Sequence, residues 1–263
     1  MPERIEIASG GVSLAACRYA GSGEGLLLLH GLAGNRGEWT QVANFITSCE
    51  VFAFDLRGHG QSEHRPIDVS PQAYCSDVAE VVKAMGHERV HLVGQSFGGH
   101  VAFLVAAWHP ELVSSLVVVE SDPDGPEPQV FDRVASWLRS WPRPFPDRLA
   151  ALEFFGPSAS GPAWVEGLEE RGGEYWPRFD ADVVLKALEA LTVRSWWDDW
   201  LRIACPTWIV RGDSGALPLE LANKMAAALP NASVVTIPGA GHEVHLDQPE
   251  RLAQVLIQLL GRA

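Results

Sequence analysis

A serine between a strand-like run and a helical pattern is the residue best suited to do chemistry. Ser96 lies at the centre of a Gly-x-Ser-x-Gly pattern, GQSFG at 94–98, which follows an apolar run at 90–93 and opens an apolar helical pattern at 97–108. The two glycines allow a strand and a helix to approach closely at a sharp turn. Such a turn lifts the hydroxyl clear of the sheet edge, where the free N–H groups of the helix face developing negative charge. The sequence therefore predicts a nucleophilic serine at this position.

A histidine late in the chain is the matching general base. His242 lies in the segment GAGHE at 239–243, directly after the last strand-like run. A loop histidine at the same sheet edge could take the proton of Ser96 and return it to a leaving group. The main-chain N–H groups of Leu32 and Phe97 are expected to form the oxyanion hole. His30 and Asp55 are expected to hold their loops in shape.

The acid that would orient the histidine has more than one candidate. Glu120 directly follows the apolar run at 116–119, and Asp213 follows the run at 207–210. Either carboxylate could accept the Nδ1 proton of His242 from the carboxyl end of a strand. We favour Glu120, because its extra methylene helps it to reach from the more distant strand. Asp213 is the alternative, and Asp122 is a third candidate.

These residues need a scaffold that brings several strand ends to one edge. Short apolar runs alternate with helical patterns, which predicts an α/β fold with a doubly wound, mostly parallel sheet. A strand is expected at 12–19, and the apolar runs that follow lie at 26–29, 51–54, 90–93, 116–119, 207–210 and 234–237. The helical patterns lie at 70–85, 97–108, 219–229 and 249–260. For the first of these, Ser70 is a candidate N-cap and Gly86 a candidate end.

One long segment interrupts the alternation. Residues 121–200 contain no strand-like run but hold seven of the ten tryptophans. A structureless loop of this length is improbable inside a compact domain. We therefore expect a mostly helical cap at 121–200, inserted between two core strands of an α/β core at 1–120 and 201–263. Most of these tryptophans are expected to pack the cap, and three are expected to contact substrate: Trp137, Trp164 and Trp197.

Taken together, these motifs resemble the α/β-hydrolase superfamily. The matching segments are HG at 30–31, DLRGHGQS at 55–62, GQSFGG at 94–99 and GH at 241–242. The resemblance extends over 5–260 and implies a Ser–acid–His triad in this chain order. The usual acid of the superfamily would fall near Gly215, whereas the position of Glu120 resembles that of the acid in haloalkane dehalogenases and a zearalenone-type lactonase. A serine nucleophile argues against dehalogenase and epoxide hydrolase chemistry.

The resemblance implies a serine hydrolase that needs no metal or cofactor. The aromatic cap favours a small-molecule substrate, a small or medium apolar ester or lactone, cleaved through an acyl-enzyme. The same triad also serves carbon–carbon bond and thioester hydrolases. Lyases, cofactor-independent oxygenases and non-catalytic ligand-binding proteins share the fold, so the fold alone does not decide between them.

Composition narrows the range of partners. The chain has 263 residues with 20 Lys and Arg against 33 Asp and Glu, a net charge of −13 that disfavours nucleic acids and anionic membranes. No apolar run approaches a membrane span, and no signal-like segment opens the chain. The four cysteines lack metal-like spacing and are expected to be buried, reduced thiols. We expect a cytoplasmic protein, a monomer or a homodimer.

Overall fold

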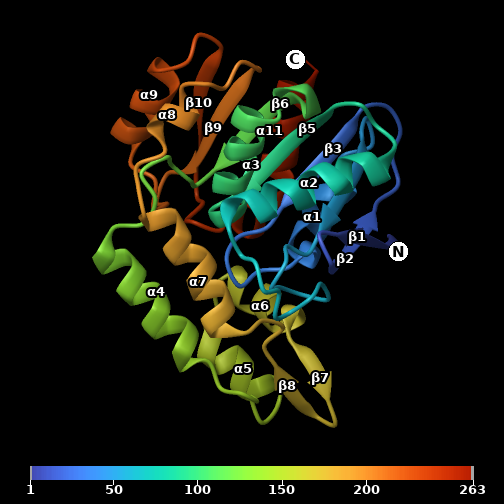
Figure 1. The fold of residues 1–263 in the computed structure, drawn as a ribbon. Helices are drawn as coiled ribbons and strands as arrows, with labels where there is room; N and C mark the ends of the chain where they lie inside the picture. The colour runs from blue at the N-terminus through green and yellow to red at the C-terminus, as the bar shows by residue number, and fades with distance from the viewer. Residues whose placement is uncertain (1, 262–263) are drawn as a thin grey trace.

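An eight-stranded sheet lies between two layers of helices in the computed structural model, which describes residues 2–261 (Figure 1). The strands are β1 (Glu3–Ser9), β2 (Val12–Arg18), β3 (Gly25–Leu29), β4 (Glu50–Phe54), β5 (Val90–Gln95), β6 (Val113–Val119), β9 (Thr207–Gly212) and β10 (Ala232–Ile237). Their order in the sheet is β1-β2-β4-β3-β5-β6-β9-β10. The pairs β1–β2 and β2–β4 are antiparallel, and from β4 to β10 all neighbouring strands are parallel. The predicted doubly wound, mostly parallel sheet is confirmed.

Alternating side chains of the strands fill two separate hydrophobic cores. Leu27 and Leu29 of β3 belong to one core, and Leu26 and Leu28 belong to the other. Both cores are apolar, which explains why the central strands lack the alternation of polar and apolar residues typical of half-exposed strands. The helices of the first core include α2 (Pro71–Met85), α3 (Phe97–Trp108), α8 (Trp197–Trp200) and α9 (Leu219–Ala227). Those of the second are α1 (Thr40–Phe45), α10 (Val244–Asp247) and α11 (Pro249–Leu260).

Helix α2 begins and ends at the predicted residues. The Ser70 hydroxyl accepts a hydrogen bond from the amide of Ala73, and Pro71 occupies the first turn, where no N–H partner is needed. The helix ends at Gly86, whose φ of 77° lies in the left-handed region that favours glycine.

Two strand regions differ from the sequence-based expectation. Strand β1 was not predicted, because it is an edge strand whose isoleucines alternate with charged residues and pair only with β2. The expectation that 121–200 contains no strand was wrong at one point, where β7 (Glu169–Arg171) and β8 (Glu174–Trp176) form a hairpin. Its two-residue turn is Gly172–Gly173, with φ values of 62° and 92°. Positive φ at both positions is the conformation that a tight hairpin turn requires.

Most of the segment between β6 and β9 lies beyond one end of the sheet, whereas its last helix, α8, packs on the sheet core (Figure 1). It contains α4 (Pro128–Ser140), α5 (Arg148–Phe155), α6 (Ser160–Gly167) and α7 (Ala181–Thr192) in addition to the hairpin. These elements share a hydrophobic core of their own, in which the Trp141 ring meets the rings of Trp164 and Phe179 edge-on at 5.4 and 5.1 Å. Ala33, from the loop after β3, belongs to the same core. The segment therefore packs against a loop at the carboxyl edge of the sheet.

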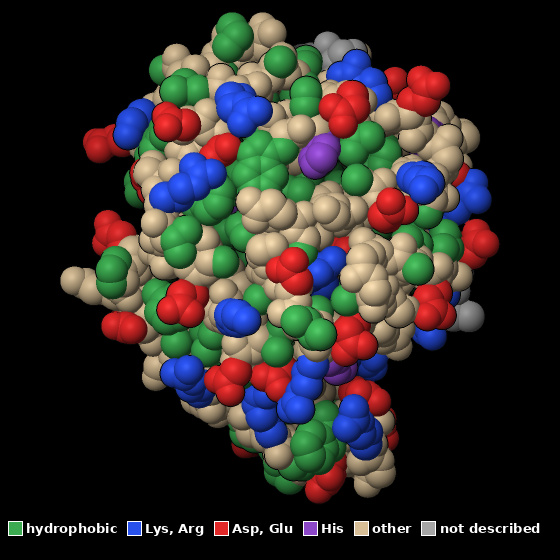
Figure 2. Space-filling model, viewed as in Figure 1, with side chains coloured by type: hydrophobic (Ala, Val, Ile, Leu, Met, Phe, Trp, Pro, Cys, Tyr) green, Lys and Arg blue, Asp and Glu red, His purple; other side chains and the backbone are tan. Residues whose placement is uncertain are grey.

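The charged surface is mixed rather than segregated on the face viewed in Figure 1. Figure 2 shows Lys and Arg side chains interspersed with Asp and Glu over that face. Of the helices between residues 2 and 261, none has the length and apolar composition needed to cross a bilayer. All four cysteines are free, and three of them are buried.

Candidate active site

Ser96 is the partly exposed residue of an otherwise buried strand–turn–helix unit. Every other residue of 90–107 is buried, whereas Ser96, between β5 and α3, is partly exposed. Its φ of 51° and ψ of −117° are unusual for a residue other than glycine, and its amide donates to the carbonyl of Val119 at 2.8 Å, which anchors the turn to β6. Strained backbone of this kind is found at functional sites that the surrounding structure holds in place.

The glycines on either side of Ser96 are required by crowding. A Cβ atom on Gly94 would collide with the backbone of Gly98, and a Cβ on Gly98 would lie 2.7 Å from the carbonyl oxygen of Leu29. Strand, turn and helix therefore approach one another too closely for larger residues. This is the physical reason for the Gly-x-Ser-x-Gly spacing.

Two main-chain N–H groups beside Ser96 are available to a ligand. Phe97 is the first residue of α3, and its N–H has no intrahelical acceptor. Leu32 follows Gly31, on which a Cβ would lie 3.4 Å from the Cβ of Ser96. Within residues 2–261, neither the Phe97 nor the Leu32 amide donates to another residue.

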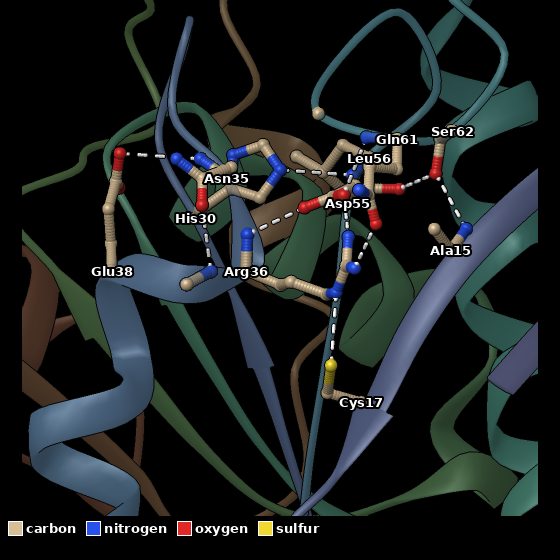
Figure 3. A network of polar contacts seen from close by, with 12 residues as sticks. Ala15, Cys17, His30, Asn35, Arg36, Glu38, Asp55, Leu56, Gln61 and Ser62 are labelled. Atoms are coloured by element: carbon tan, nitrogen blue, oxygen red, sulfur yellow. Dashed lines mark hydrogen bonds and ion pairs between the residues drawn. The ribbon is translucent and has the colours of Figure 1, made fainter. Parts of the chain in front are cut away.

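Side-chain bonds hold the loop that carries Leu32 (Figure 3). His30 Nε2 accepts the amide of Leu56 at 3.0 Å, so its Nδ1 carries the proton and donates to the carbonyl of Gly31 at 2.7 Å. Burial lowers the pKa of His30 to about 4, which keeps the ring neutral at pH 7. The Asp55 carboxylate accepts the amides of Arg36 and Gln61, each at 2.7 Å.

Glu120 lies at the carboxyl end of β6 and contacts His242. Its carboxylate accepts three main-chain amides, those of Gly212 at 2.8 Å, Ala216 at 2.6 Å and Leu217 at 3.0 Å. Its Oε2 also lies 3.3 Å from Nδ1 of His242. A φ of 52° turns the chain sharply at Glu120. Three N–H donors fix the buried carboxylate in one orientation, with an oxygen facing the histidine.

Gly215, near which the resemblance described above would place the acid, makes room for Glu120. A Cβ on Gly215 would collide with the carboxylate of Glu120. The other two candidates make different contacts. The exposed Asp213 accepts the amide of Gly239 at 3.1 Å, and Asp122 accepts the amide of Asp124 at 2.9 Å.

His242 is tied to the serine turn through a residue that the sequence analysis missed. The buried Gln95 donates from Nε2 to the carbonyl oxygen of His242 at 3.1 Å, which places the histidine loop beside the residue that precedes Ser96. The only signal in the sequence is an amide side chain directly after an apolar strand. The side chain of His242 is 38% exposed. Burial lowers its pKa, but the hydrogen bond to Glu120 and the charge of Glu243 outweigh burial, so the pKa is raised above 6.5.

A second acid–histidine pair lies behind the His242 loop. His245 Nε2 is 3.4 Å from Oε2 of Glu38, and both side chains are buried. Burial raises the pKa of Glu38 to about 8 and lowers the pKa of His245 to about 4. At neutral pH both groups are therefore mainly uncharged, and the pair joins the short helix η1 (Arg36–Trp39) to α10. The ring of Trp39 stacks on His245 at 4.6 Å.

The three tryptophans expected to contact substrate lie in different surroundings. Trp164 lines a small cavity together with Ala33 of the loop after β3. Trp137 is 39% exposed on α4. The Trp197 indole donates to Asp124 at 2.8 Å, and the ammonium of Lys224 lies 4.3 Å from the centre of its ring.

Three other apolar residues lie between the sheet core and the core of the inserted segment. Leu32, Phe131 and Val134 pack against both cores and remain partly exposed. The sequence analysis did not single out Phe131 and Val134, although they share one face of the amphipathic helix α4. Within residues 2–261, no group of three His, Cys, Asp or Glu residues has an arrangement that could hold a metal ion.

Comparison with known proteins places this chain in a family. The alpha/beta hydrolase family model matches residues 26–255. An uncharacterized protein of Mycobacterium tuberculosis is 38% identical over 122 residues, which are 46% of this chain and 36% of that protein, so the chain matches about a third of the length of its first curated relatives. An esterase of the same organism is 28% identical over 97% of this chain and 88% of its own length. The crystal structure of E-2-(acetamidomethylene)succinate hydrolase superposes with a TM-score of 0.90, at 22% identity over 99% of this chain and 100% of that one. Because the family model spans most of its length, this protein belongs to the alpha/beta hydrolase family.

Proposed function

We propose that this protein is a serine hydrolase that cleaves a small or medium apolar ester or lactone. Ser96 is the nucleophile, His242 the general base and Glu120 the acid that orients it. The observation that carries the proposal is the contact between His242 Nδ1 and the Glu120 carboxylate, 3.3 Å apart, next to a partly exposed serine in a strained turn. The esterase of M. tuberculosis, similar over nearly the whole chain, supports the same class of reaction.

The proposed reaction starts with the transfer of one proton. His242 carries its own proton on Nδ1, where Glu120 accepts it, so the lone pair of Nε2 is free to take the proton of the Ser96 hydroxyl. The serine oxygen attacks the carbonyl carbon of the substrate and forms a tetrahedral intermediate. The N–H groups of Leu32 and Phe97 donate to its oxyanion.

The second half of the reaction restores the enzyme. His242 returns the proton to the leaving alcohol, and the carbon–oxygen bond to that alcohol breaks, which leaves an acyl group on Ser96. A water molecule then attacks the acyl carbon while His242 takes a proton from it. The proton returns to Ser96 as the acid leaves. Glu120 stabilises the imidazolium that forms in each half of the reaction.

The apolar substrate class rests on the residues next to the oxyanion loop. Leu32, Phe131 and Val134 offer partly exposed apolar surface between the two cores, and the aromatic residues around Trp141 lie behind Ala33. Burying one methylene group contributes about 0.8 kcal/mol, so an acyl chain gains about three- to fourfold in binding for each carbon that contacts such a surface.

A substrate panel tests this proposal. We expect p-nitrophenyl esters to be hydrolysed with a kcat/KM that rises with acyl chain length and then falls once the apolar surface is filled. Aliphatic lactones of matching size test the second substrate class. A p-nitrophenyl half-ester of succinate serves as a charged control and should be a poor substrate. If the folded protein hydrolyses none of these esters and lactones, the proposal is wrong.

The pH dependence of turnover tests the role of His242. The general base must be neutral, so kcat/KM should fall as the pH falls through the pKa of His242. Because that pKa is raised, the midpoint of the acidic limb should lie above pH 6.5. Replacing Glu243 by glutamine removes a charge that raises this pKa, so the midpoint should move to lower pH. A profile measured from pH 5 to pH 9 checks both expectations, and a native midpoint below 6.5 would contradict them.

A further inference from the structure

A pocket lies between the sheet core and the inserted segment, and it shares Asn35, Gly167 and Arg178 with the small cavity beside Trp164. Its volume is about 490 Å³, within the size range of small-molecule sites. One wall comes from the core, from β1, β2 and the η1–α1 region, and the other comes from the end of α6 and from Arg178, just before α7. Ser96, Glu120 and His242 do not line it. The mechanism proposed above leaves this pocket without a role.

The floor of the pocket is built from an ordered polar network. Arg36 donates from Nε to the Cys17 sulfur at 3.1 Å and from Nη2 to the Gln61 side-chain oxygen at 2.6 Å, and it pairs with Asp55 (Figure 3). The side chain of Arg36 is 11% exposed, so its donors serve the protein rather than solvent. The Tyr19 and Thr40 hydroxyls, which also line the pocket, lie 3.1 Å apart. The floor is therefore preorganised, and the buried Asp55 charge is offset within it.

Two arginines in the walls of the pocket, Arg4 and Arg178, have no carboxylate partner among residues 2–261. Glu166, the other carboxylate that lines the pocket, pairs with Arg148. Within residues 2–261, neither Arg4 nor Arg178 forms a salt bridge or a side-chain hydrogen bond. The hydrogen bond that Arg171 donates to Glu169 at 2.6 Å is the main cause that lowers the pKa of Glu169, and the charge of Arg178 contributes less.

The pocket therefore concentrates positive charge on an acidic protein. Both lining carboxylates are paired, and two guanidinium groups remain, one from each wall, although the chain carries a net charge of −13. A guanidinium presents several N–H donors in a planar fork that matches the two oxygens of a carboxylate or phosphate. The neighbouring hydroxyl and amide groups suit the polar body of the same molecule.

We propose that this pocket binds a small organic anion through Arg4 and Arg178. The anionic group is a carboxylate or phosphate, and the rest of the ligand contacts Tyr19, Thr40 and Gln61. Such a ligand contacts the sheet core with one side and the inserted segment with the other. It therefore stabilises the folded protein in proportion to its occupancy.

Calorimetric titration and thermal unfolding of the full chain test this inference. The probes are citrate for carboxylates, glycerol 3-phosphate for phosphates, and propane-1,2,3-tricarboxamide as a neutral control of citrate-like shape. At least one anion should bind at one site with a Kd of about 1 mM or tighter and raise Tm, and the tricarboxamide should do neither. Arg4→Gln and Arg178→Gln should each weaken binding by about tenfold, the effect of losing a charged hydrogen-bonding group.

Two controls keep this test separate from the serine site. Arg251→Gln removes the same charge from an exposed position on α11 and should leave binding unchanged. Ser96→Ala should also leave it unchanged, so the result does not depend on the proposed hydrolase activity. Citrate binding that outweighs glycerol 3-phosphate binding would assign the site to carboxylates, and the reverse order would assign it to phosphates. The inference is overturned if no anion binds, or if binding survives in both arginine variants.

Discussion

Replacing Ser96 by alanine is expected to lower kcat by about 10⁵-fold or more, while the protein stays folded. The acyl-enzyme cannot form without the serine oxygen, and only the oxyanion hole and substrate binding still accelerate the attack of water. The turn should survive because its backbone is held by the bond from the Ser96 amide to Val119 and by the glycines around it. Turnover of the best ester in the panel, corrected for the uncatalysed rate, measures the loss.

A covalent probe gives the matching readout. A fluorophosphonate should label the native protein once, and peptide mapping should locate the label on Ser96. Ser76→Ala serves as the control, since Ser76 is an exposed serine on α2 and its loss should leave both labelling and turnover intact. If Ser96→Ala retained turnover within tenfold of the native value, or if the label mapped to another residue, the assignment of the nucleophile would be wrong.

Replacing Glu120 by glutamine is expected to lower kcat by about 10⁴-fold. Glutamine keeps the size of the side chain but removes the charge that stabilises the imidazolium. Both oxygens of Glu120 accept main-chain amides, so the –NH2 group of glutamine would face an N–H donor in either orientation and disturb the contact with His242. Kinetics on the same ester measure the loss, and circular dichroism checks that the variant remains folded.

Asp213→Asn is the matched control for the acid. The Asp213 carboxylate is exposed and accepts the Gly239 amide, so its replacement is expected to change turnover by about twofold at most, as for other surface substitutions. The two variants remove the same charge from the ends of neighbouring strands. A larger loss in Asp213→Asn than in Glu120→Gln would reverse the assignment of the acid.

The fold could be predicted because its strongest signals are local. The apolar run at 26–29 has leucines facing both cores, and a glycine precedes it, so its length and composition alone indicate a buried strand. Strand β1 gave no such signal, since an edge strand alternates charged and apolar residues and depends on its single neighbour. The β7–β8 hairpin is held by a Gly-Gly turn and three residues on each side, too few for a periodic pattern.

The site was only partly accessible from sequence, for a different reason. Spacing along the chain indicates which strand ends Glu120 and Asp213 follow, but it does not give the direction in which each backbone turns after its strand. That direction depends on the positive φ of Glu120 and on the hydrogen bonds that three main-chain amides of residues 212–217 donate to its carboxylate. These are contacts between parts of the chain that are distant in the sequence. The link from Gln95 to His242 joins parts of the chain that are 147 residues apart.

The close approach of Gly215 and Glu120 also limits how this site could have changed during evolution. The carboxylate of Glu120 fills the volume that any side chain at 215 would need. A chain with an acid at 215 could not hold the Glu120 carboxylate in its present position, so this chain could not move its acid to 215 by one substitution. The exchange requires either two changes together or an intermediate form with neither acid in position.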